Sequence, residues 1–199
     1  TMDAYSAAYL GSTEVYGERI TPFGANALTV NGYLGTDGIE PALKTGGSIF
    51  VLVKTSNKSS GELQDRRLCD GKTIYETMGD MCEKWGEKYM GSYGYSAVGA
   101  VVGATYPAML AEMREKLPHT FFLVPGYGAQ GGGAEGVAKG FDENGLGAIV
   151  NSSRAIMCAY KKEGCDEHDY AGAARREALR MKEDITSHIP AIKAPSQDK

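Results

Sequence analysis

Short apolar segments alternate with helical segments along most of this chain. Five apolar segments end in Gly, Ser, Thr, Asn or Pro, and we expect them to be strands: Ala27–Asn31, Ser48–Val53, Ala97–Val102, Phe121–Val124 and Leu146–Val150. The almost entirely apolar Ser48–Val53 is typical of a strand buried on both faces of a sheet. The helices are expected at Thr1–Tyr9, Asp37–Lys44, Thr73–Tyr89, Pro107–Leu117, Ala134–Asp142 and Glu167–His188. This alternation predicts parallel βα units with helices on the sheet.

Two architectures fit this order of elements, an open doubly wound sheet and a barrel. A (β/α)₈ barrel usually needs about 250 residues, whereas this chain has 199 and starts at a helix cap, Thr1. We therefore expect about the last five βα units of a (β/α)₈ TIM barrel, with an N-terminally incomplete barrel domain over residues 1–189. Residues 190–199 are polar and are expected to be a tail.

Composition excludes several classes of function. The net charge of −4 argues against a nucleic-acid-binding protein, which usually carries a basic face. No apolar run approaches the roughly 20 residues of a membrane helix, and no signal peptide opens the chain. Four cysteines lack C-x-x-C spacing and histidine partners, so we expect reduced thiols, no metal site and a cytoplasmic protein: Cys69, Cys82, Cys158 and Cys165.

The stretch Phe121–Gly133 is the strongest local signal of function. Four apolar residues precede a Pro-Gly pair, and five glycines fall within the eight positions that end at Gly133. A glycine-rich turn between a strand and a helix lets backbone N–H groups converge on an anion. Counted from the C-terminus, this turn follows the seventh barrel strand and Asn151–Arg154 follows the eighth. Barrel enzymes commonly bind phosphate between those two loops, which predicts a phosphate site here.

Polar side chains at the predicted strand ends are candidate ligand contacts. The Arg154 guanidinium, beside a glycine loop, is suited to a phosphate dianion, although a surface salt bridge is the alternative. Gln130 could donate its amide to the ligand or could be a solvated loop residue. Ser56 could contact a base or a sugar or could cap a helix. Further candidates of the same kind are Thr55, Asn31 and Thr105.

The sequence does not support a dinucleotide-binding site. Gly126–Gly131 matches the dinucleotide pattern G-x-G-x-x-G, but the next strand ends in Val150-Asn151 and not in the acidic residue that would bind a ribose. We therefore reject a nicotinamide dinucleotide site.

The three histidines are isolated in the sequence, and we expect them to be structural or solvated: His119, His168 and His188.

Taken together, these segments resemble the orotidine 5′-phosphate decarboxylase family, in the subgroup with the loop Pro-Gly-x-Gly-Ala-Gln-Gly-Gly. The stretches that carry the resemblance follow the family's order over nearly the whole chain: Thr29–Gly35, Phe50–Asn57, Val101–Thr105, Pro125–Gly132 and Asn151–Ile156. The resemblance implies a barrel homodimer that converts orotidine 5′-phosphate to UMP in pyrimidine biosynthesis, without a metal or an organic cofactor.

The resemblance also implies roles for individual residues. Gln130 and Arg154 would bind the 5′-phosphate, with Ser153 nearby. Ser56 and the backbone around Pro125 would face the pyrimidine.

The catalytic residues of the family are expected outside this chain. Thr1 matches the last residue of the family's Asp-x-Lys-x-x-Asp-Ile-Gly-x-Thr stretch, a threonine that reaches across the dimer to the neighbouring substrate. The two aspartates and the lysine that protonates C6 would then precede Thr1, and Lys54 does not replace that lysine. We therefore expect no catalytic residue in this chain and no activity from it alone. The alternatives are a non-catalytic nucleotide-phosphate binding fragment or another phosphate-binding barrel lyase or isomerase.

Overall fold

A five-stranded parallel sheet forms the centre of the molecule. The computed structural model describes residues 1–128, 132–164 and 167–192. The strands are β3 (Ala27–Val30), β4 (Ser48–Lys54), β5 (Val98–Val102), β6 (Phe122–Pro125) and β7 (Ala148–Asn151). All five predicted strands are confirmed, with ends shifted by one or two residues. The sheet order is β3-β4-β5-β6-β7 with every pair parallel. Because this order has no reversal point, the barrel prediction holds and the doubly wound alternative does not.

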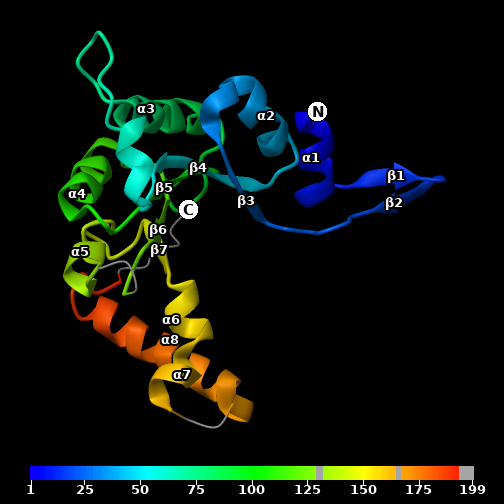
Figure 1. Ribbon diagram of the computed structural model, residues 1–199. Coiled ribbons are helices and arrows are strands. Elements are labelled where there is room, and N and C mark those ends of the chain that lie inside the picture. Colours follow the sequence, from blue (N-terminus) through cyan, green and yellow to red (C-terminus); the bar gives the residue numbers. More distant parts are fainter. Residues whose placement is uncertain (129–131, 165–166, 193–199) are drawn as a thin grey trace.

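The first helix precedes the sheet, and the others follow its strands in sequence (Figure 1). They are α1 (Met2–Tyr9), α2 (Thr36–Lys44), α3 (Ile74–Gly86), α4 (Pro107–Lys116), α5 (Ala134–Ala138), α6 (Ser153–Met157), α7 (Ala159–Glu163) and α8 (Tyr170–Thr186). Short 3₁₀ turns lie at η1 (Gly32–Leu34), η2 (Lys58–Glu62) and η3 (Glu167–Asp169). Neighbouring helices pack on one another in the series α3, α4, α5 and α8. Among the described helices, none has the length and apolar character needed to cross a membrane.

The two faces of the sheet differ in burial. On β4, Ile49 and Val51 pack under the helices and are fully buried. The opposite face carries Leu52 and Ile149, which are 36% and 52% exposed. In a closed barrel that second face would be the packed interior. The sheet is thus part of a (β/α)₈ barrel. Strand β4 was expected to be buried on both faces, and it is buried only on the face that the helices cover.

Several helix ends differ from the sequence prediction for local reasons. Helix α5 stops at Ala138, short of the predicted Asp142, because the next N–H groups, from Lys139 to Phe141, donate to carbonyls three residues back. Asp142 Oδ1 then accepts hydrogen bonds from the N–H groups of Asn144 and Leu146, both at 2.8 Å. Such a side-chain turn competes with helix continuation. The last helix starts at Tyr170, since the residues before it form η3, and it ends at Thr186 and not at His188. The domain boundary near residue 189 stays a prediction.

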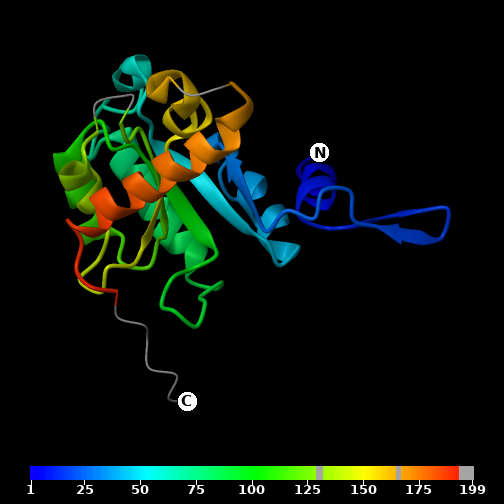
Figure 2. The same ribbon diagram turned by 90° about the horizontal axis from the view of Figure 1, so that it is seen from below.

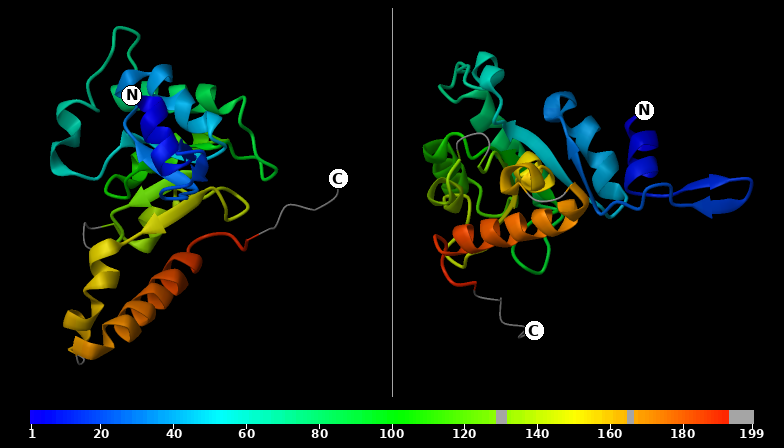
Figure 3. Two further views of the ribbon diagram at one scale, coloured as in Figure 1. Left: turned by 90° about the vertical axis from the view of Figure 1, so that its right-hand side faces the viewer. Right: turned by 60° about the horizontal axis from the view of Figure 1, so that its bottom comes forward.

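A two-stranded hairpin, not predicted from the sequence, separates α1 from β3. Strands β1 (Thr13–Val15) and β2 (Glu18–Ile20) pair antiparallel through a turn at Tyr16 and Gly17, with φ of 52° and 82°. Positive φ at both central residues is the type I′ geometry of tight hairpins. The hairpin projects away from the rest of the chain (Figures 1, 2 and 3). It precedes β3 and so lies toward the N-terminal ends of the parallel strands.

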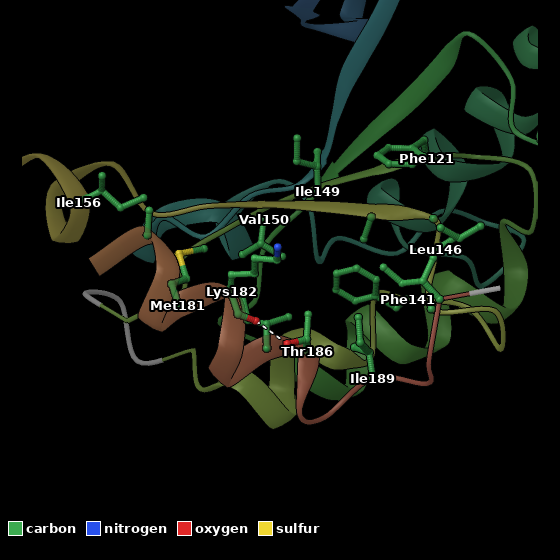
Figure 4. A pocket seen from close by; sticks show the side chains of 16 residues that line it. Phe121, Phe141, Leu146, Ile149, Val150, Ile156, Met181, Lys182, Thr186 and Ile189 are labelled. Carbon is green, nitrogen blue, oxygen red and sulfur yellow. Dashed lines mark hydrogen bonds between the residues drawn. The ribbon is translucent and has the colours of Figure 1, made fainter. Parts of the chain in front are cut away.

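An apolar groove lies between β7 and α8 (Figure 4). Its volume is about 420 Å³, and its lining includes Phe141, Leu146, Met181 and Ile189. Lys182 is the only charged side chain in the lining, so the groove is unsuited to a phosphate. It borders the outer edge of β7, where the five-stranded sheet ends.

Candidate functional site

A small polar cavity lies at the carboxyl ends of β4, β6 and β7. Its volume is about 130 Å³. It brings together four of the six predicted ligand contacts, and these are Ser56, Pro125, Ser153 and Arg154. The other lining residues belong to the two loops predicted to bind phosphate, and they are Gly126, Tyr127, Asn151 and Ser152. Pro125 and Asn151 are register partners on β6 and β7, so strand pairing alone places them side by side.

Ser56 reaches the cavity because the turn after β4 is fixed from two sides. The Gln64 side chain accepts from the Thr55 N–H at 3.0 Å and donates to Thr55 Oγ1 at 2.8 Å. On the other side, Gly103 donates its N–H to Lys54 O at 2.7 Å. A Cβ on Gly103 would lie 2.9 Å from the Cβ of Ser56. Only glycine therefore allows β5 to approach the Ser56 turn so closely.

Arg154 lies in the first turn of α6 and is exposed. Within the described residues its guanidinium forms no salt bridge with a carboxylate. The surface salt bridge considered as the alternative is therefore not found there. An exposed guanidinium beside polar side chains can bind an anion through several N–H donors.

The glycine turn after β6, Gly126–Gly133, lies beside Arg154, and its residues Gly126 and Tyr127 line the same cavity. Gly126 and Gly128 have φ of 104° and 78°, a region that favours glycine. The Gly128 N–H donates to Gly132 O at 2.9 Å, which closes the turn on itself. A Cβ on Gly132 would lie 2.9 Å from the Cβ of Ala104. The turn is thus packed tightly on the end of β5. Gln130, predicted to bind phosphate, lies outside the described residues.

Three other predicted contacts, Thr1, Asn31 and Thr105, do not line this cavity. Thr1 is exposed at the start of α1 and does not line it. Asn31 Oδ1 accepts from the Tyr33 N–H at 3.0 Å and so caps η1. Thr105 Oγ1 is buried and has no hydrogen-bond partner in the part of the chain that the structure describes. In the same residues, no cluster of three or more His, Cys, Asp or Glu side chains is placed to hold a metal ion.

This arrangement defines a class, namely parallel α/β barrel proteins with a polar, cationic site at the carboxyl ends of their strands. The chain belongs to the family described as Orotidine 5′-phosphate decarboxylase / HUMPS family, whose model matches residues 11–164.

Individual relatives agree with this assignment. The chain is 46% identical over 193 residues to the orotidine 5′-phosphate decarboxylase of Rhodopirellula baltica, covering 93% of this chain and 63% of that protein. It is 47% identical over 191 residues to that of Caldicellulosiruptor saccharolyticus, covering 93% and 61%. The solved structure of Leishmania donovani OMP decarboxylase is similar with a TM-score of 0.70 and 29% identity, covering 93% of this chain and 63% of that one. The chain thus spans less than two thirds of the length of these relatives.

Proposed function

We propose that this chain is the substrate- and phosphate-binding part of an enzyme that decarboxylates orotidine 5′-phosphate to UMP in pyrimidine biosynthesis. The observation that carries the proposal is the convergence of Ser56, Pro125, Ser153 and Arg154 on one cavity at the carboxyl ends of three strands. The relatives named as orotidine 5′-phosphate decarboxylases support the same substrate.

In this proposal, each side of the cavity binds one end of the nucleotide. Arg154 and the N–H groups of the glycine turn bind the 5′-phosphate through charge-assisted hydrogen bonds. Ser56 and the backbone around Pro125 face the pyrimidine. Binding energy from the phosphate, remote from the reacting carbon, holds the base where the transition state is stabilised.

In this proposal, the bond-breaking step is carried out by the family's Asp-x-Lys-x-x-Asp stretch, and no residue of the cavity is assigned to it. The C6–carboxylate bond breaks, CO₂ leaves, and the electron pair left at C6 takes a proton from the family's lysine. That lysine is expected before Thr1, so the chain from Thr1 to Lys199 should bind nucleotide without forming UMP. An assay of CO₂ release from orotidine 5′-phosphate tests this. Turnover by the chain alone would contradict the placement of the lysine.

Binding of UMP tests the site itself. Titration of the chain with UMP and with uridine should show tighter binding of UMP, because only UMP carries the phosphate. Arg154→Ala should weaken UMP binding by about 1.5–3 kcal/mol, the range for a hydrogen bond to a charged group. Arg175→Ala is the matched control, since Arg175 is an exposed arginine on α8 outside the cavity. Equal losses in the two variants would contradict the site.

A non-catalytic nucleotide-binding role is the second candidate, because Ser56, Pro125, Ser153 and Arg154 in the cavity are all proposed ligand contacts. It predicts the same UMP binding, but also no decarboxylation when the upstream segment of a relative is joined to this chain. Recovery of turnover in that fusion would exclude this candidate.

We further propose a cytoplasmic homodimer whose active site lies near the interface. Free Cys69, Cys82 and Cys158 fit a reducing compartment. Thr1 is exposed and available to a partner. Sedimentation analysis should give a species of twice 21.2 kDa, and Thr1→Ala should weaken UMP binding only in that dimer. A monomer at all concentrations would contradict this proposal.

A further inference from the structure

Tyr127 is the one large side chain in the described part of the glycine turn, and it is held from two directions. Its side chain is 4% exposed, and its hydroxyl donates a hydrogen bond to Asp184 Oδ2 on α8. Its backbone carbonyl accepts a 2.8 Å hydrogen bond from Ser152 Oγ. Ser152 comes just before the turn of α6 that carries Arg154. Tyr127 therefore joins the glycine turn to the last helix and to the Arg154 segment.

The face of α8 that meets Tyr127 is charged. Arg180 lies one helical turn before Asp184, and its guanidinium pairs with Glu177 at 2.6 Å. Tyr127, Arg180 and Asp184 line a second cavity of about 330 Å³ next to the turn. Burial and the hydrogen bond to Asp184 raise the pKa of Tyr127. Its hydroxyl therefore remains protonated, as a donor, at neutral pH.

The glycines on either side of Tyr127 make the turn depend on the hydrogen bond between the Tyr127 hydroxyl and Asp184. Gly126 and Gly128 have no side chains to pack, and glycine loses more backbone freedom on ordering than any other residue. The turn also has its own closing bonds and packs through Gly132 on Ala104, whereas Tyr127 joins it to α8 through its hydroxyl and to Ser152 through its carbonyl. The direction of the N–H groups near the cavity thus follows the placement of Tyr127.

We propose that Tyr127 is a positioning residue for the anion site, because its hydroxyl bond to Asp184 fixes the glycine turn against Arg154. This inference rests on the proposed function, since it concerns the same phosphate site. It predicts a loss specific to the phosphate end of the nucleotide, while contacts with the base and the sugar are unaffected.

The test compares UMP and uridine binding to the full chain and to Tyr127→Phe. Removal of one hydrogen-bonded hydroxyl is expected to weaken UMP binding by about 3- to 10-fold and to leave uridine binding unchanged. Asp184→Ala should behave like Tyr127→Phe. Asp184→Asn should retain most of the affinity, because its amide oxygen still accepts the tyrosine proton.

Tyr95→Phe is the matched control. The Tyr95 hydroxyl also donates to a carboxylate, Asp142 Oδ2, at 2.5 Å. That pair lies in the segments before β5 and β7, toward the opposite end of the strands. Its removal should affect stability without changing UMP affinity.

Two results would overturn the inference. One is unchanged UMP affinity in Tyr127→Phe, and the other is an equal loss for UMP and uridine. Amide hydrogen exchange at Gly128 and Gly132, whose N–H groups donate the closing bonds of the turn, gives a measurement that needs no nucleotide. Exchange there should quicken in Tyr127→Phe but not in Tyr95→Phe, and identical exchange in the two would also overturn the inference. If the unaltered chain fails to bind UMP while exchange does quicken, the proposed function fails and the positioning role stands.

Discussion

The ammonium group of Lys54 is buried at the end of β4, and its ion pair gives a sharp stability prediction. The Lys54 side chain is 1% exposed, whereas the side chain of its partner Asp65 is 42% exposed, and the Nζ–Oδ1 distance is 2.6 Å. Ser60 Oγ lies 3.4 Å from the same nitrogen. The rings of Tyr75 and Tyr106 lie 5.7 and 5.0 Å from it.

This asymmetry in burial makes the two ends of the pair unequal. Asp65→Ala leaves a buried ammonium without its counter-ion, and breaking a buried pair in this way costs about 3–5 kcal/mol. The rings of the two tyrosines and Ser60 still stabilise the Lys54 ammonium in this variant. We therefore expect a loss of folding free energy at the lower end of that range, about 3 kcal/mol. Lys54→Met leaves only an exposed carboxylate, which water solvates, and a side chain of similar length fills the site. Its cost should be below about 1.5 kcal/mol.

Urea unfolding of the full chain, followed by circular dichroism, measures both values. Asp65→Ala should lower the folding equilibrium constant by about a hundredfold, and Lys54→Met should lower it far less. The double variant should resemble Lys54→Met alone. Asp80→Ala is the control, because Asp80 pairs with exposed Lys72 at the same 2.6 Å and should change stability little. A larger loss in Lys54→Met than in Asp65→Ala would refute the reasoning.

Two further predictions concern the site and pH. Gly103→Ala places a Cβ within 3.0 Å of the Ser56 backbone N, so it should displace the Ser56 turn and weaken uridine binding in calorimetry; unchanged affinity would exclude a role for that turn. The Lys116 ammonium, followed by Thr73, lowers the pKa of Glu76 to about 2. A carboxyl group whose pKa is lowered in the folded state stabilises the fold at pH values above its unfolded pKa, near 4.5. This stabilisation is lost as the pH falls toward 2. The stability gap between the unaltered chain and Glu76→Gln should therefore close over that range, and a constant gap would contradict the assignment.

Much of the fold could be predicted because it rests on local patterns. The apolar run at Ser48–Val53 marks β4, and the Pro-Gly pair after Val124 marks the end of β6. The hairpin could not be predicted, because all six residues of β1 and β2 are exposed and their sequence does not alternate between apolar and polar residues. It depends on the turn at Tyr16 and Gly17, a pair with weak sequence signal for a type I′ turn.

The candidate site was predictable only in part. Arg154, Ser153, Pro125 and Ser56 follow strands, and parallel strands bring their carboxyl ends to one edge, so their convergence follows from the topology. The contact of Tyr127 with Asp184 spans 57 residues and depends on how α8 packs, which no spacing in the sequence encodes.

A crystal structure of the chain with UMP tests the central claim most directly. The 5′-phosphate is predicted to lie between the Arg154 guanidinium and the backbone at Gly126–Gly128, with the pyrimidine beside Ser56. UMP bound elsewhere, such as in the groove between α2 and α3 beside Trp85 and Lys88, would contradict the claim.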